Sequence, residues 1–144
     1  MFKNILIPIS GDGIRTSDIK KLLKITGVDG CKFTLAFVSN PYSPYVYAEF
    51  GDVLAIPDSD YKKACQSFAD KLFEKVSAKF GGLIHQTCHI YNPNVADGII
   101  EAAKKSKSDL IAMTSHKRTG LGGIFFGSDT HRVILSTKLP VLVV

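Results

Sequence analysis

Apolar positions follow two alternating patterns along this chain. Five short runs, residues 3–9, 31–39, 83–91, 109–113 and 140–144, are nearly continuous in apolar and β-branched residues, which is typical of strands covered on both faces. Between these runs, apolar residues recur every three or four positions, the spacing of amphipathic helices. The predicted order is β-α-β-α-β-α-β-α-β, and it indicates an α/β fold with a parallel open sheet, right-handed crossovers and helices on both faces.

Three of the four predicted helices carry recognisable start signals, and the first two also carry end signals. Short polar side chains accept backbone N–H groups at helix starts, whereas glycine ends helices because it tolerates positive φ. The second helix, residues 58–80, is the longest, and the fourth spans about residues 128–137. The expected starts and ends are Thr16 or Ser17 and Gly27 for the first helix, Asp58 or Ser59 and Gly81 with Gly82 for the second, and Asn92 with Pro93 at the start of the third.

A long connection, residues 40–57, separates the second run from the second helix. It contains three prolines and three tyrosines, and a loop of this length is unusual in a compact domain. Two interpretations remain open for it: packing against the domain, or a functional lid or partner surface.

Length and composition indicate one domain, residues 1–144. The 144 residues are 45% apolar and 22% charged, an ordinary balance for a soluble domain with its own core. No apolar run reaches the ~20 residues that a membrane-spanning helix needs, and the first apolar run is too short for a signal peptide. We therefore expect no membrane association and a cytoplasmic location.

Charge, cysteine and histidine positions exclude several classes of function. The net charge of +5 is dispersed over helix faces, whereas nucleic-acid binding requires a clustered basic surface, so no nucleic-acid partner is expected. The odd number of separated cysteines, Cys31, Cys65 and Cys88, indicates reduced thiols. His85 and His89 share one face of a predicted strand, but ~13 Å separates such positions, too far for one metal ion.

The segment between the fourth run and the last helix carries the clearest candidate chemistry. It combines several glycines with Lys117 and Arg118, and it leads into a helix start at Gly127 and Ser128. Backbone N–H groups at a helix start bind phosphate, and glycine permits the chain to approach closely. Asp129 opposes this, because a carboxylate there repels phosphate. A phosphate-binding loop and a simple connection both remain open.

The chain resembles the universal stress protein family over essentially its full length. The residues that carry the resemblance are "NILIPISGDG", "NPNVADGIIEAAKKSKSDLIAMTS" and "GLGGIFFGSDTHRVILSTKLPVLVV". The resemblance implies a five-stranded Rossmann-like sheet in the order 3-2-1-4-5, dimerisation through the last strand, and ATP binding through a motif G-x-x-G, nine residues, then G-[ST].

This chain matches only part of that motif. Gly127 and Ser128 match its end, but Thr114 and Lys117 stand where the family has its two leading glycines, and Ser10 stands where the family has an aspartate. The resemblance implies site residues that line the base side of the bound nucleotide, pack on its adenine ring or surround its phosphates. They are Pro8, Ile9, Ser10, Val38, Met113, Thr114, His116, Lys117, Gly127, Ser128, Asp129 and Thr130.

The first functional hypothesis is a cytoplasmic stress-response protein that senses or carries ATP or another adenine nucleotide, with Mg²⁺, and acts through unidentified protein partners. It is expected to form a homodimer through residues 140–144, an apolar edge strand. The alternative is a dimeric interaction module that has lost nucleotide binding.

Catalysis is not expected. The chain has no Walker loop, no G-x-S-x-G and no H-E-x-x-H, and Ser10, Asp12 and His116 are weak evidence for a triad. A third and less favoured hypothesis treats residues 41–57 as the lid of an enzyme.

Overall fold

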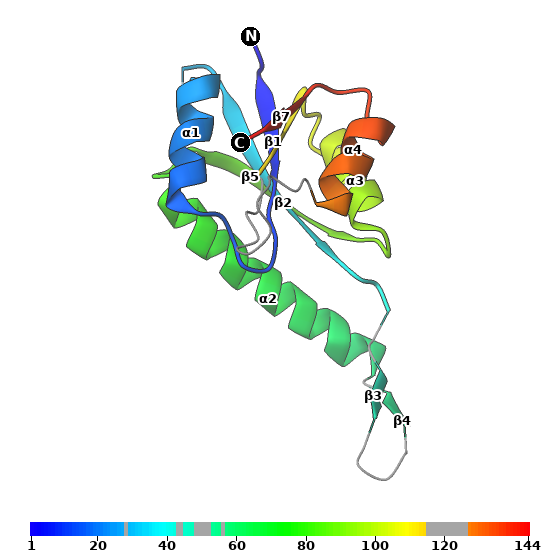
Figure 1. Ribbon diagram of the computed structural model, residues 1–144. Coiled ribbons are helices and arrows are strands. Elements are labelled where there is room, and N and C mark those ends of the chain that lie inside the picture. The colour runs from blue at the N-terminus through cyan, green and yellow to red at the C-terminus, as the bar shows by residue number, and fades with distance from the viewer. Residues whose placement is uncertain (28, 43–44, 48–52, 56, 115–126) are drawn as a thin grey trace, which may run out of the picture.

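The computed structural model describes residues 1–27, 29–42, 45–47, 53–55, 57–114 and 127–144. Five parallel strands form the central sheet in the order β5-β2-β1-β6-β7 (Figure 1). In chain order this is the predicted 3-2-1-4-5 arrangement, which is confirmed. The strands are β1 (Asn4–Pro8), β2 (Lys32–Ser39), β5 (Ile84–Tyr91), β6 (Leu110–Met113) and β7 (Val141–Val143).

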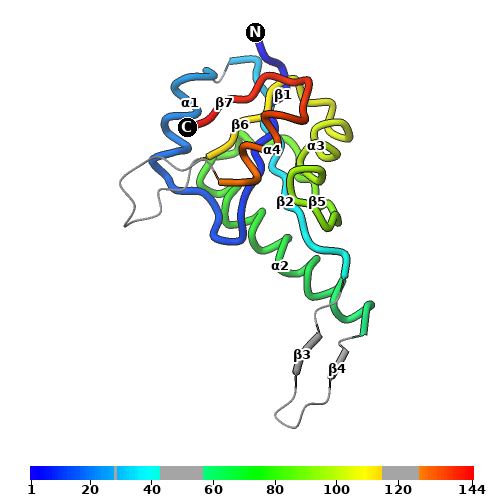
Figure 2. Tube along the Cα trace, turned by 45° about the vertical axis from the view of Figure 1, so that its right-hand side comes forward, coloured from blue at the N-terminus to red at the C-terminus, as the bar shows by residue number. Residues whose placement is uncertain are grey.

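Two pairs of helices cover the two faces of the sheet (Figure 1). Side chains alternate between faces along a strand, so Ile5 and Ile7 pack in one core while Leu6 packs in the other. Figures 1 and 2 both show α3 and α4 side by side on the second face. The helices are α1 (Thr16–Thr26) and α2 (Asp58–Lys79) on the first face, and α3 (Val95–Lys105) and α4 (Ser128–Ser136) on the second.

The helix ends confirm some of the predicted caps and correct others. Gly27 ends α1 with φ of 71°, and Gly81 and Gly82 follow α2 with φ of 60° and 87°, as predicted. The predicted starts are wrong by one or two residues. Arg15 and Pro57 occupy the cap positions of α1 and α2 without side-chain cap bonds, so Thr16, Ser17, Asp58 and Ser59 do not cap these helices.

The start of α3 also differs from the prediction. Asn94, and not Asn92, caps this helix, accepting the Asp97 N–H at 3.0 Å. Asn92 instead accepts the Asn94 N–H at 2.9 Å, which turns the chain before the helix begins. Pro93 therefore lies in this turn, outside the first helical position.

The connection before α2 holds local structure that was predicted as a loop. Residues Tyr45–Tyr47 (β3) and Val53–Ala55 (β4) pair as a two-stranded antiparallel sheet. After it, α2 buries residues only in its C-terminal half, between Ala69 and Val76. Phe68, which precedes this buried part of α2, is 50% exposed.

Neither cysteine bridges nor spanning helices occur among the residues described. Cys31, Cys65 and Cys88 are free thiols at half-buried positions. In this part of the chain no helix has the length and apolar content required to cross a bilayer.

Candidate functional site

The order of the strands reverses between β1 and β6, and open α/β sheets bind ligands beyond the carboxyl ends of strands at such a point. Pro8 ends β1 and Met113 ends β6. Because β6 and β7 are parallel, the intervening α4 runs back across the sheet, so its N-terminus lies at this same edge. Residues at positions 8–10, 113–114 and 127–130 are thereby brought to one edge of the fold.

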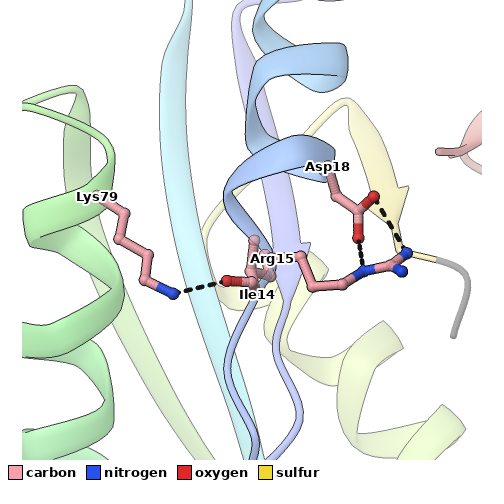
Figure 3. A network of polar contacts seen from close by, with 4 residues as sticks. All are labelled: Ile14, Arg15, Asp18 and Lys79. Atoms are coloured by element: carbon pink, nitrogen blue, oxygen red, sulfur yellow. Dashed lines mark hydrogen bonds and ion pairs between the residues drawn. The ribbon is translucent and has the colours of Figure 1, made fainter.

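The loop from Ser10 to Arg15, which forms one side of this edge, is held by several polar contacts. The Gly13 N–H donates to the Ser10 carbonyl at 2.9 Å, and the φ of 81° at Gly13 favours glycine there. Lys79 of α2 donates to the Ile14 carbonyl at 2.9 Å (Figure 3). Arg15 donates from Nε to Asp18 Oδ2 at 2.8 Å and from a terminal nitrogen to Oδ1 at 3.2 Å. The loop is therefore fixed to both α1 and α2.

Ser10 supplies an unpartnered polar atom at this edge. Its Oγ is buried and has no hydrogen-bond partner among the described residues. A buried hydroxyl without a partner is costly, since the desolvation of the group is not compensated. Ser10 replaces the family's aspartate and can donate or accept a hydrogen bond where a carboxylate can only accept.

The N-terminus of α4 is the second polar feature. Gly127 occupies its cap position and offers no side chain to the first N–H groups, and Ser128 and Asp129 are exposed. The orphan N–H groups and the positive end of the helix dipole favour an anion. Asp129 is an acidic side chain in this first turn, so part of the positive potential is neutralised.

Three of the expected site residues are occupied in packing. Ile9 is buried in the α1/α2 core and Met113 in the α3/α4 core, and they are 7% exposed. Val38 points to the α3 face, where its two methyl groups lie against Gly98. Pro8 and Thr114 are half-buried at the strand ends, and Thr130 is buried in α4. His116 and Lys117 lie outside the described residues.

No metal centre is present in the part of the chain that the structure describes, where no three potential ligands come together. His85 is exposed on β5, while His89 makes hydrogen bonds to Ser39 and Gln66. The contact between Ser39 and His89 was not predicted from sequence, because β2 and β5 pair only in the folded sheet.

Three comparisons place the chain among known proteins. A model of the universal stress protein family matches residues 1–144. Universal stress protein MJ0531 of Methanocaldococcus jannaschii is 30% identical over 144 residues, which are 100% of this chain and 82% of that protein.

Two solved structures share the fold. Hypothetical protein MJ0577 has a TM-score of 0.66 and 23% identity, with 100% of this chain and 96% of that chain covered. The universal stress protein of Archaeoglobus fulgidus in complex with dAMP has a TM-score of 0.56 and 13% identity, with 97% and 95% covered. From the match over its whole length and the identity to a curated relative, this chain belongs to the universal stress protein family.

Proposed function

We propose that this protein binds an adenine nucleotide at the β1/β6 edge and acts as a dimeric sensor or regulator in the cytoplasm. The observation that carries the proposal is the uncapped N-terminus of α4 at the edge where strand order reverses. A family member of the same fold that binds dAMP supports the adenine nucleotide as ligand. Mg²⁺ would accompany the phosphates of ATP, and the role of this edge of the sheet would be binding without catalysis.

The proposed contacts use both polar features of the edge. Ser128 and the first N–H groups of α4 would bind a phosphate, and the Ser10 hydroxyl would gain the partner that it lacks. Lys117 would add positive charge to offset the missing glycines of the motif. Val38 is only half-buried in spite of its contact with Gly98, and it would contribute to the adenine side of the site.

Calorimetric titration of the nucleotide-stripped protein with ATP and Mg²⁺ is the direct test. We expect a dissociation constant in the micromolar range or below, and AMP in a parallel titration measures the contribution of the outer phosphates. A flat titration at several temperatures, with an unchanged melting temperature, would contradict the proposal.

Gly127→Asp is expected to weaken ATP binding at least tenfold, or about 1.4 kcal/mol. The aspartate would cap α4, occupying its N–H groups and repelling phosphate, so the melting temperature should stay level or rise while affinity falls. No atom of the described residues lies within 4 Å of a Cβ at this position, so that part of the fold should accept the change. Lys117→Glu should weaken binding similarly.

Lys138→Glu is the matched control, because this exposed lysine follows α4 at the opposite edge of the sheet. It makes the same change of charge as Lys117→Glu, and affinity should stay within about twofold of the unaltered protein at moderate salt. Equal affinity in Gly127→Asp, Lys117→Glu and the control would refute the assigned site.

The proposed dimer pairs β7 with its copy in a second chain. In the described fold β7 is an edge strand whose three residues are half-buried. An apolar edge strand of this kind favours such pairing. Sedimentation at micromolar concentration should give twice the chain mass of 15.7 kDa, and a monomer there would exclude this assembly.

A second candidate function is an interaction module without a nucleotide. It is favoured by Thr114 and Ser10, which replace residues of the family's motif. A protein partner that binds equally with and without ATP would support it, and release of that partner by ATP would count against it.

A further inference from the structure

Four side chains form a continuous hydrogen-bonded series across β2, β5 and α2. Ser39 Oγ lies 2.8 Å from His89 Nε2, and His89 Nδ1 lies 3.1 Å from Gln66 Oε1. Gln66 Nε2 in turn donates to Asp70 Oδ1 at 2.8 Å. Ser39 ends β2, so the series reaches the ligand-binding edge of the sheet.

Asp70, the last residue of the series, determines which atoms of Gln66, His89 and Ser39 carry the protons of these hydrogen bonds. A carboxylate only accepts, so the amide nitrogen of Gln66 faces Asp70 and its oxygen faces the imidazole. Because that oxygen can only accept, Nδ1 of His89 carries the proton. Nε2 of the neutral ring is then left with a lone pair, and the Ser39 hydroxyl donates to it.

Burial keeps this imidazole neutral near pH 7. Desolvation lowers the pKa of His89 below the ordinary 6.5, and the nearby charge of Asp70 opposes the shift less strongly. The ring is also held in position, since it stacks on Phe37 with centroids 5.9 Å apart and contacts Tyr91 at 4.6 Å. A serine bonded to an oriented, neutral histidine is the general arrangement of an activated nucleophile.

An open pocket of about 410 Å³ adjoins Ser39. Its lining is mostly aromatic or small, including Phe37, Ala64, Cys65 and Phe68, and none of the described residues that line it is charged. Asn40 also lines it, and the carbonyl oxygen of its side chain accepts the Tyr42 N–H at 2.9 Å. The amide nitrogen of that side chain takes no part in this bond, and in the proposal below it would be the donor to a developing oxyanion.

We propose that Ser39 is a nucleophile with His89 as its general base, and that it takes acyl groups from small, uncharged carboxylic esters. Ser39 Oγ bonds to the ester carbonyl carbon while its proton passes to Nε2. Collapse of the adduct breaks the bond to the leaving alcohol, which takes the proton from His89. Water, deprotonated by His89, then attacks the acyl-serine and releases the carboxylic acid, restoring Ser39.

This reactivity is separate from the proposed nucleotide function. It uses neither the N-terminus of α4 nor Thr114. Val38, which also lines the pocket beside Ser39, is the residue that the two proposed sites share. Failure of one proposal is therefore distinguishable from failure of the other, because calorimetry with ATP measures the first and serine modification measures the second.

An uncharged alkyl fluorophosphonate tests the proposal, since it forms a stable bond from serine oxygen to phosphorus with loss of fluoride. Peptide mass spectrometry should locate the label on Ser39, and Ser39→Ala should abolish it. His89→Gln should slow labelling about 100-fold, the usual contribution of a general base. Ser67→Ala, at an exposed position of α2, is the matched control and should be labelled at the original rate. p-Nitrophenyl acetate hydrolysis should follow the same ranking.

The pH dependence of the labelling rate in the unaltered protein is a second test, and it does not depend on whether any variant folds. Labelling should fall as His89 is protonated, with an apparent pKa below 6.5. Asp70 of α2 is the charged group that acts on the ring, and Tyr91 of β5 contacts it. The titratable or charged groups that surround Tyr91 in turn are Asp58, Tyr61, Lys62 and Cys65 of α2. A folded protein whose Ser39 stays unmodified at every pH, or equal labelling rates in folded His89→Gln, would overturn the proposal.

Discussion

Replacing Gly98 by valine is expected to lower the free energy of unfolding by about 3 kcal/mol, the upper part of the range for overpacked cores. A Cβ at this position of α3 would lie 2.6 Å from Val38 Cγ1 and 2.8 Å from Cγ2. Both methyl groups belong to a short β-branched side chain on the sheet, which has little freedom to move away. The helix would have to lift from β2, and urea denaturation would measure the loss.

Two further variants isolate that contact. Lys104→Val, on the exposed face of α3, should change stability by no more than about 0.5 kcal/mol. In a double-mutant cycle, Val38→Ala should recover at least about 1 kcal/mol of the cost of Gly98→Ala, because it removes both clashing methyl groups. Strict additivity in the cycle would show that the two residues do not oppose each other.

Arg15→Leu is expected to cost about 3 kcal/mol at pH 7, the lower end of the range for a broken buried ion pair, because Asp18 is buried while the Arg15 side chain is 51% exposed. Asp18 is only 3% exposed, and its carboxylate accepts two hydrogen bonds from Arg15 (Figure 3). Without the guanidinium, a buried charge would stay uncompensated at the start of α1. Chemical denaturation of both proteins measures the difference, and the loop from Ser10 to Arg15 should lose order with it.

Combining Arg15→Leu with Asp18→Asn separates charge from packing. The amide carries no charge, so the double variant should regain most of the stability that the single change loses. If Arg15→Leu lowered the free energy of unfolding by less than about 1 kcal/mol, the contact between Arg15 and Asp18 would contribute no more than an exposed ion pair does.

The helix starts show where prediction from sequence reached its limit. Asn92 and Asn94 are both good capping residues, and the choice between them depended on a turn in which Asn92 accepts the Asn94 N–H. Gly27, by contrast, was predicted correctly as the end of α1, because positive φ is a local property of glycine.

Of the two candidate sites, one could be found from the sequence and the other only from the structure. Gly127 and Ser128 could be found from sequence, since a glycine before a helix is a local signal for phosphate binding. Ser39 and His89 could not, because they are 50 positions apart and meet only when β2 and β5 pair.

The order of the four helices and of the five strands of the central sheet, and the family, were determined by the sequence alone. These follow from periodicity, local propensity and motif, each of which is read within a few neighbouring residues. Only the tertiary structure decided that Val38 would meet Gly98, that Asp18 would be buried, and that a serine at one strand end would contact a histidine of the next strand. The pattern of a segment specifies which way its side chains point, whereas the segment placed opposite is chosen by packing of the whole chain.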